Sequence, residues 1–172
     1  VISEQETGIE WTYQRDKKLK KFFFQKKIDW IECSYPGVKR GQHDRNLWAK
    51  NFRNEIIKKS NLPIIKQSVN LELTNHELPK FFYDSTPCPH RQKGGSVEAE
   101  KLLQSFLNKR GENYQFEMSS PITAEKSCSR LSTHLTYGTI SHRTVFQEAT
   151  KKRDQIKHKN KNFAKSINSF LS

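Results

Sequence analysis

The sequence predicts an α/β edge followed by a mostly helical region. Three observations support this fold class. A short run rich in Ile and Trp follows an amphipathic helix near the N-terminus, a Pro-rich stretch without periodicity lies in the middle, and several segments with helical apolar spacing follow Gly94-Gly95. We therefore divide the chain into residues 1–58, a linker at 59–93 and a helical region at 94–172.

Residues 1–40 are predicted to form one α/β unit. After a short opening segment, Thr12 is expected to cap an amphipathic helix. The apolar face of this helix holds Leu19, Phe22 and Phe23. The run Ile28 to Cys33 ends before the turn-forming pair Pro36-Gly37, which is typical of a strand buried on both faces of a parallel sheet. One strand and one helix do not complete a sheet, so further sequence is expected upstream.

A second helix is expected after Asp44, which can cap it, because Trp48, Phe52 and Ile56 recur every fourth residue. Beyond Ser60 the periodicity fades, which predicts a long linker. Prolines interrupt this stretch at Pro63, Pro79, Pro87 and Pro89.

Helices dominate the last part of the predicted fold. Ser96 is expected to cap a helix that stops at Gly111, and a second helix is expected from about Ala124 to Thr136, ending near Gly138. Ser141 is expected to cap a third helix. A final apolar stripe runs to the end of the chain through Phe163, Ile167, Phe170 and Leu171, and we expect it to continue in a longer protein.

The chain is strongly basic, with a formal charge of +13, a pI near 9.7 and a mean hydropathy of −0.89. Such a positive field attracts polyanions, among which nucleic acids are the commonest. The alternative is that the Lys-rich stretches, Lys17 to Lys27 and Lys151 to Lys161, are solvated helix faces. Charge alone leaves both interpretations open.

The three cysteines, Cys33, Cys88 and Cys128, are far apart and form no CxxC pair, which favours a reducing, cytoplasmic setting without disulfides. Cys88-Pro89-His90 offers two metal ligands without two more at a usual spacing, so no metal site is predicted. No apolar run approaches the roughly 20 residues of a membrane span.

The most informative segment is Ser127-Cys128-Ser129-Arg130-Leu131-Ser132, expected in the early part of a helix. Free backbone N–H groups and the helix dipole attract anions there, and short hydroxyl side chains add donors. The alternative is that the serines only cap a helix. Two histidines flank the segment, His134 and His142, and they are expected at exposed positions, with phosphate or DNA contacts as the alternative.

A longer pattern surrounds these serines: Ser129-x-Leu131-Ser132-x-x-Leu135-x-x-Gly138-x-Ile140-Ser141-x-Arg143. It resembles the start of the FAD-binding domain of DNA photolyases and cryptochromes. Gly94-Gly95-Ser96-x-x-Ala99 resembles the glycine pair and first helix of that domain. Tyr114, seven residues before Pro121, matches a family tyrosine at the phosphate region of the flavin.

The resemblance extends upstream to the end of the family's N-terminal antenna domain. The residues that carry it are Glu6-Thr7-Gly8, Thr12-Tyr13-x-Arg15-Asp16, Trp30-x-Glu32 and Gly37-Val38-x-Arg40. It implies a partial photolyase-like architecture: the last βαβ unit of an antenna domain at 1–58, a linker at 59–93, and the first helices of an all-helical FAD-binding domain at 94–172.

The resemblance also implies a set of FAD-binding residues, which comprises Tyr114, Ser127, Cys128, Ser129, Arg130, Leu131 and Ser132. Cys128 stands where many members carry Thr, and a thiol is a much weaker donor than a hydroxyl. Thr133 replaces a frequent Pro, and no Arg follows Tyr114 where some DNA-repairing members place one. The remaining half of the flavin cradle is expected beyond this chain, and no catalytic residue is assigned within it.

The implied function is that of a blue-light flavoprotein, first a photolyase-like lyase that repairs pyrimidine dimers in damaged duplex DNA by electron transfer from FAD. A second antenna chromophore is a further expectation for the full-length protein. The alternatives are a cryptochrome-type photoreceptor without repair activity and a basic nucleic-acid-binding module without a cofactor. The 172-residue chain alone is expected to be inactive and to hold FAD weakly.

Overall fold

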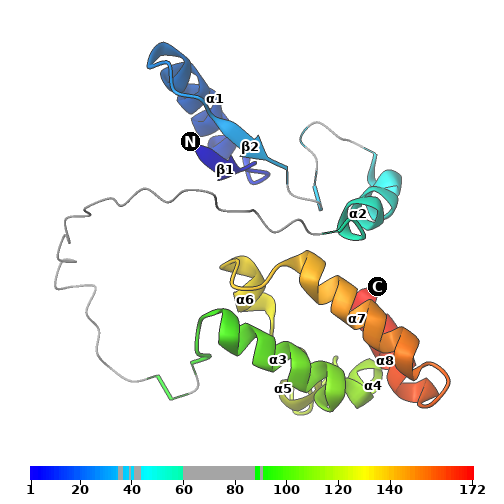
Figure 1. The fold of residues 1–172 in the computed structure, drawn as a ribbon. Coiled ribbons are helices and arrows are strands. Elements are labelled where there is room, and N and C mark those ends of the chain that lie inside the picture. Colours follow the sequence, from blue (N-terminus) through cyan, green and yellow to red (C-terminus); the bar gives the residue numbers. More distant parts are fainter. Residues whose placement is uncertain (35–36, 39, 41–43, 60–87, 90) are drawn as a thin grey trace, which may run out of the picture. The chain divides into compact units, whose positions relative to one another are not determined.

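The computed structural model describes residues 1–34, 37–38, 40, 44–59, 88–89 and 91–172 (Figure 1). The chain divides into two compact units, Val1–Lys58 and Lys59–Ser172. Most of the expected linker at 59–93, with Pro63, Pro79 and Pro87, lies outside the described residues. The assignment of the two units to photolyase domains remains a prediction.

The first unit contains a small parallel sheet, as the sequence predicts. Strand β1 (Ile2–Glu4) pairs with β2 (Ile31–Cys33), and Ile2 lies opposite Ile31. Helix α1 (Glu10–Gln25) connects the two strands. The indole of Trp30 donates a 2.9 Å hydrogen bond to the Ser3 hydroxyl and packs edge-on against Phe23, with 5.4 Å between ring centroids. A polar and an aromatic contact therefore hold the helix and both strands together.

Two details of this unit differ from the predictions. Thr12 is not the N-cap of α1, because the helix begins at Glu10, and the Thr12 hydroxyl instead donates to the carbonyl of Ile9 at 2.7 Å. The strand is not buried on both faces, since Ile31 is 58% exposed and Cys33 is exposed. Among the described residues, β1 is the strand that pairs with β2.

A charged network ties α1 to the sheet. The buried carboxylate of Asp16 accepts hydrogen bonds from Arg15 and Arg40. Burial by itself raises the pKa of this carboxyl, but the hydrogen bonds and charges of the two guanidinium groups outweigh it and hold the pKa of Asp16 below its ordinary value. Arg40 also donates to the Glu32 carboxylate at 3.1 Å and to the Glu6 carbonyl at 2.6 Å. All five residues belong to the pattern that resembles the antenna domain.

A second helical segment closes the first unit. Asp44 precedes the short 3-10 turn η1 (Arg45–Leu47), and its carboxylate accepts a 2.9 Å hydrogen bond from the amide of Asn46. The predicted cap therefore serves this turn, and helix α2 (Trp48–Ile56) begins after it. Only part of the expected apolar stripe is buried, with Ile56 at 1% exposure and Trp48 at 48%.

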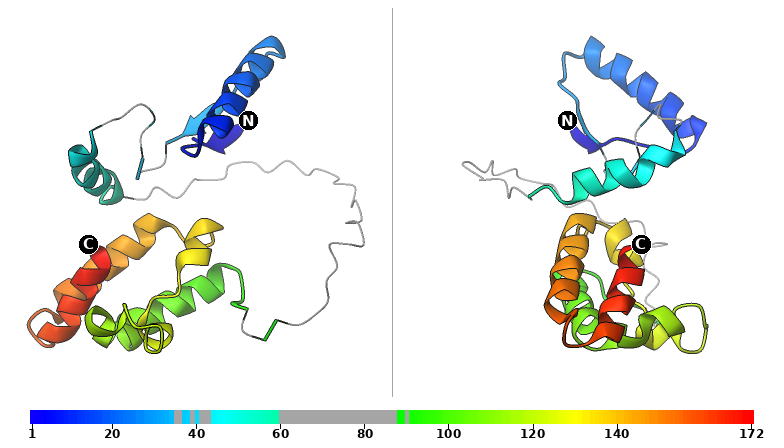
Figure 2. Two further views of the ribbon diagram at one scale, coloured as in Figure 1. Left: turned by 180° about the vertical axis from the view of Figure 1, so that it is seen from behind. Right: turned by 90° about the vertical axis from the view of Figure 1, so that its right-hand side faces the viewer.

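The second unit is helical throughout the residues that the structure describes. Its elements are α3 (Ser96–Asn108), η3 (Arg110–Asn113), α4 (Tyr114–Glu117), α5 (Ala124–Ser127), α6 (Ser132–Thr136), α7 (His142–Ile156) and α8 (Lys161–Leu171). Helices α7 and α8 lie side by side in every view (Figure 1, Figure 2). The fold class is thus confirmed in its coarse form, a small parallel α/β portion followed by a helical portion, and the photolyase architecture stays a prediction.

One apolar core holds these helices together. Its buried members are Ala99, Leu103, Phe106, Leu107, Leu131, Ile140, Val145, Ala149, Phe163 and Ile167. The final stripe of the sequence packs into this core, because Phe163 and Ile167 are buried and Phe170 lies 4.7 Å from Phe106 between ring centroids. Burial of one Val, Leu, Ile or Phe side chain contributes about 1.5–3 kcal/mol to the stability of the fold.

Helix caps agree only in part with the predictions. The Ser141 side chain accepts a 3.0 Å hydrogen bond from the Thr144 amide, as predicted. Asn160, which the sequence reasoning missed, caps α8 through the Phe163 amide at 3.0 Å. Gly95 rather than Ser96 is the N-cap of α3. Helix α3 stops at Asn108, before Gly111, and a Cβ on Gly111 would lie 2.8 Å from the Phe106 ring.

The largest correction concerns the helix expected from Ala124 to Thr136. The structure has two short helices there, α5 and α6, separated by a non-helical break at residues 128–131. The serine-rich segment therefore spans a break between helices rather than the start of a long helix. Among the described residues, none of the helices combines the length and apolar character that a bilayer crossing needs.

Candidate functional site

The break between α5 and α6 is held open mainly by the side chain of Arg110, which binds two of its carbonyls. Its Nη1 donates to the carbonyl of Cys128 at 2.5 Å, and its Nη2 donates to the carbonyl of Ser129 at 3.2 Å. In a continuous helix these carbonyls would accept from amides four residues later, so the guanidinium replaces the helical partners. The apolar spacing of the sequence predicts one continuous helix here, but the tertiary contact of Arg110 interrupts it.

Arg110 also gives the break a positive charge. Its other contacts are to the Ser105 hydroxyl at 2.8 Å and the Leu102 carbonyl at 3.1 Å, so every hydrogen-bond partner it has among the described residues is neutral. Burial lowers the pKa of Arg110, and the nearby charge of Arg130 lowers it further. Two guanidinium groups therefore lie close together at the break, where an anion would relieve their repulsion.

Two of the seven predicted FAD-binding residues, Ser127 and Leu131, are buried. Ser127 is 4% exposed, and its hydroxyl donates to the Glu117 carboxylate. Leu131 is 1% exposed and belongs to the core. An acidic neighbour repels phosphate, and a buried leucine offers no side-chain donor. The argument from the dipole of a long helix is also wrong here, because α6 has only 5 residues.

The other residues of the segment remain at or near the surface. Cys128 and Ser129 are half-buried, and Ser132 is exposed at the first turn of α6. Arg130 adopts a left-handed backbone conformation with φ 63°, a strained choice for a residue with a side chain. The turn that Arg110 braces thus brings the hydroxyls of Ser129 and Ser132 and the side chain of Arg130 to one short stretch of chain.

Tyr114 reaches the same region from α4. Its ring packs edge-on against Phe106 at 5.6 Å and Phe170 at 5.8 Å between centroids, so the core fixes its position. Burial raises the pKa of its hydroxyl, and the proximity of Cys128 adds to the rise. Tyr114, Cys128 and Arg110 are therefore neighbours, although they come from different parts of the sequence.

The two flanking histidines do not occupy the exposed positions expected of them. His134 is only 3% exposed, and His142 is half-buried. Sequence reasoning missed the burial of His134 and the role of Arg110, because both depend on contacts between distant segments and neither follows from spacing along one helix. The sequence contains one hint at Arg110, which is a cation just before Tyr114.

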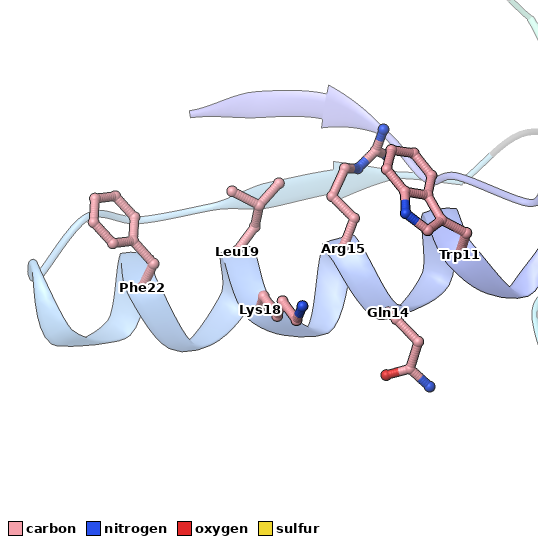
Figure 3. Close-up of a pocket in the computed structure, with 6 residues that line it drawn as sticks. All are labelled: Trp11, Gln14, Arg15, Lys18, Leu19 and Phe22. Carbon is pink, nitrogen blue, oxygen red and sulfur yellow. The ribbon is translucent and has the colours of Figure 1, made fainter.

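A separate hollow lies on the first unit. Figure 3 shows its six lining residues on α1, where Trp11, Arg15, Leu19 and Phe22 follow one another along the side of the helix next to the strands. Leu19 and Phe22 belong to the predicted apolar face of this helix, but Phe22 is 49% exposed and Trp11 is 69% exposed. The predicted apolar face of α1 is thus only partly covered within the described residues.

A comparison with models of known protein families finds no match, and a comparison with curated proteins finds no significant one. The resemblance to photolyases and cryptochromes therefore rests on the residue pattern alone. In the part of the chain that the structure describes, no three His, Cys, Asp or Glu side chains cluster as metal ligands would. His90, half of the Cys88-Pro89-His90 pair, lies outside that part.

Proposed function

We propose that this chain is part of a blue-light flavoprotein and that the break between α5 and α6 holds the diphosphate of FAD. The observation that carries the proposal is the turn braced by Arg110, whose guanidinium binds the backbone of the serine segment and lies within range of the charge of Arg130. Hydroxyl, amide and guanidinium donors are the groups that bind phosphate oxygens most strongly. Ser127 and Leu131 have no direct part in this binding, whereas Ser129, Arg130 and Ser132 do.

Reduced FAD would supply the photochemistry, passing an electron to a pyrimidine dimer and receiving it back. The residues of this chain bind and orient. Ser129 and Ser132 donate to the diphosphate, Arg110 and Arg130 balance its charge, and Tyr114 forms the wall next to Cys128. Cys128 contributes little as a donor, because a thiol donates weakly.

The binding role is tested by adding a negative charge to the segment in the complete protein. Ser129→Asp and Ser132→Asp are each expected to weaken FAD binding at least about tenfold, because a carboxylate repels the diphosphate. Ser132 is exposed, so a carboxylate there stays in water and loss of FAD by Ser132→Asp cannot be ascribed to unfolding. Fluorescence titration of FAD measures the affinity.

The matched control is Ser119→Asp, an exposed serine outside the segment. The same charge at that position is expected to leave the FAD affinity within about twofold. Equal affinities for all three variants and the unchanged protein would refute the assignment of the segment to the diphosphate.

The first candidate among light-driven activities is a photolyase, and a cryptochrome would use the same flavin segment. The formal charge of +13 favours the photolyase, since repair requires binding to duplex DNA. The deciding experiment exposes the complete, FAD-loaded protein and dimer-containing DNA to blue light. Loss of dimers only under illumination supports a photolyase, and light-driven flavin reduction without repair supports a cryptochrome.

A second candidate, a basic nucleic-acid-binding module without cofactor, is favoured by the contact between Ser127 and Glu117. That contact gives one serine of the cluster a purely structural role. Purified complete protein without flavin absorbance that still binds DNA would support this candidate and exclude the flavoprotein.

A further inference from the structure

The second unit has a cleft beside the proposed flavin segment, and Arg130 belongs to both. It is lined by residues 91–94 from the segment before α3 and by five residues between Arg130 and Thr139, and its volume is about 450 Å³. Volumes of roughly 300–1,000 Å³ are usual for small-molecule sites. The cleft is therefore large enough for a ligand of mononucleotide size.

Side-chain hydrogen bonds of Gln92 hold one wall of the cleft in place. The Gln92 side chain donates to the Arg130 carbonyl at 2.9 Å and accepts from the Thr133 hydroxyl at 3.2 Å. These two bonds fix the segment before α3 against the break and against α6. Residues almost forty positions apart in the sequence thus form one surface.

A second set of bonds positions His134 in this wall. Helix α6 ends in a Schellman turn, where the Thr139 amide donates to the His134 carbonyl at 2.9 Å and the Gly138 amide donates to the Leu135 carbonyl at 3.3 Å. Gly138 has φ 66°, which suits glycine at this position. The turn brings the Thr139 hydroxyl to 2.8 Å from Nδ1 of His134.

The other ring nitrogen of His134 has no partner among the described residues. His134 is 3% exposed, lines the cleft, and carries a buried Nε2 without a hydrogen bond. A buried polar atom without a partner costs about 1–3 kcal/mol, so such atoms in native proteins usually serve a ligand or a water. The Thr139 hydroxyl donates to the His134 carbonyl at 3.3 Å and therefore accepts from Nδ1, which leaves Nε2 of the neutral ring an acceptor. A ligand hydroxyl that donates to Nε2 removes the cost.

The charge of the cleft selects an anion. Arg91, Lys93 and Arg130 line it, and the one carboxylate paired with them among the described residues is Glu125, which is exposed and 3.9 Å from Arg130. The carboxylate of Glu98 pairs with Lys101 at 2.7 Å and also interacts with the charge of Lys93. The cleft therefore has three cations against two nearby carboxylates, one of which is shared with Lys101, and it keeps a net positive charge.

An aromatic ring stands beside these cations. Tyr137 lines the cleft and is 83% exposed, so its ring is accessible to a ligand. A ring of this kind stacks on the base of a nucleotide, a contact worth about tenfold or more in affinity. Phosphate donors and a stacking platform in one cleft are the two requirements of nucleotide recognition.

We infer that this cleft binds a nucleoside monophosphate, with the phosphate held by Arg91, Lys93 and Arg130, a ligand hydroxyl at His134 and the base stacked on Tyr137. The cleft adjoins the proposed flavin segment and shares Arg130 with it. Arg91, Lys93 and Tyr137 take no part in the flavin proposal, so the two proposals can fail independently.

The test is calorimetric titration of the 172-residue chain with AMP at about 0.15 M salt, where exposed charges attract ligands only weakly. Saturable binding of one AMP is expected, and its absence overturns the inference. The double variant Arg91→Gln/Lys93→Gln is expected to weaken AMP at least about tenfold, because charge-assisted hydrogen bonds are lost. The control Lys151→Gln/Lys157→Gln removes the same charge from exposed positions of α7 and its C-cap and should stay within about twofold.

Further arms separate the ligand classes. Tyr137→Ala should lower the affinity for AMP but leave the affinity for inorganic phosphate unchanged. An equal loss of both affinities would show that the base does not stack on Tyr137. Binding of a single-stranded oligonucleotide without binding of AMP would assign the cleft to nucleic acid instead.

The role of His134 has its own readout, since a variant of a buried residue can fail to fold. The ¹⁵N resonances of its ring in the unmodified chain should shift when AMP is added. Unchanged ring resonances at saturating AMP would exclude His134 from the site.

Discussion

Single residues decide the chemistry of the break between α5 and α6, and Arg110 is the most important of them. It replaces helical hydrogen bonds at two carbonyls and brings a charge without a carboxylate partner among the described residues. The same side chain therefore explains both why the helix is interrupted and why the interruption attracts an anion. Its contacts span α3 and the break, which no local sequence pattern reveals.

Replacement of Arg110 by Lys tests this structural role. Lysine keeps the charge, but its ammonium group cannot satisfy the Cys128, Ser129 and Leu102 carbonyls together, so the second unit should lose about 1–3 kcal/mol of stability. Urea denaturation followed by far-UV circular dichroism measures the loss. The neighbouring exposed residue provides the control, with Lys109→Gln expected within about 0.5 kcal/mol of the unchanged chain. An unchanged midpoint for Arg110→Lys would mean that the break does not depend on the guanidinium.

Asp16 gives the first unit an acid-sensitive stability. Its pKa is lower in the folded state than in the unfolded state, so its contribution is complete above the unfolded value of about 3.9 and is lost as the pH falls from there through the folded value. Acid unfolding followed by tryptophan fluorescence should therefore begin below about pH 4. Asp16→Asn should destabilise the unit at pH 7 and flatten the acid dependence. An equally steep loss in Asp16→Asn would assign it to another carboxylate.

Among the helical elements, the C-terminus of α6 connects backbone geometry to the proposed nucleotide cleft. Gly138→Ala should cost about 1–2 kcal/mol because of its positive φ alone, since no atom lies within 4 Å of a Cβ built there. The variant should also weaken AMP, because the turn holds Thr139 against His134. Thermal unfolding and titration measure the two effects. Gly94→Ala is the control for stability, because a Cβ there also meets open space but the backbone has no positive φ. It should leave the free energy of unfolding unchanged. An equal loss of stability in both variants would contradict the account of the turn.

The predictability of these elements depends on how local their causes are. Helix α3, the Ser141 cap of α7 and the apolar stripe of α8 follow from spacing and capping within one segment, and the structure has them. The break at residues 128–131 was not predictable, because its apolar positions continue the helical period while Arg110 supplies the interruption from a distance. In the candidate site, the sequence pattern identified Ser129 and Ser132 as members of the serine segment. It did not predict the hydrogen bond from Ser127 to Glu117, because that bond joins two separate helices.

At the scale of the whole chain, each of the two units has its own internal contacts, and the two differ in how much apolar surface they bury. The second unit has a ten-residue buried core, whereas the first has a two-stranded sheet and several exposed apolar residues. Small units with little buried surface are marginally stable. All three tryptophans, Trp11, Trp30 and Trp48, lie in the first unit and report on it alone.

Urea unfolding should therefore give two transitions that do not coincide. Tryptophan fluorescence is expected to change at a lower urea concentration than the main loss of helical circular dichroism, because the less stable unit carries the fluorescent residues. Ile167→Ala, which opens the core of the second unit, should shift only the later transition, by about 2–5 kcal/mol. Coincident curves that shift together would show that the chain unfolds as one cooperative body.

The central claim for the whole molecule is that it carries a flavin. The most direct measurement is the flavin released on denaturing the purified complete protein, identified and quantified by absorbance and mass. The account predicts about one FAD per protein molecule, with a markedly lower content in Ser129→Asp than in Ser119→Asp. A colourless protein that takes up no FAD on reconstitution would contradict it.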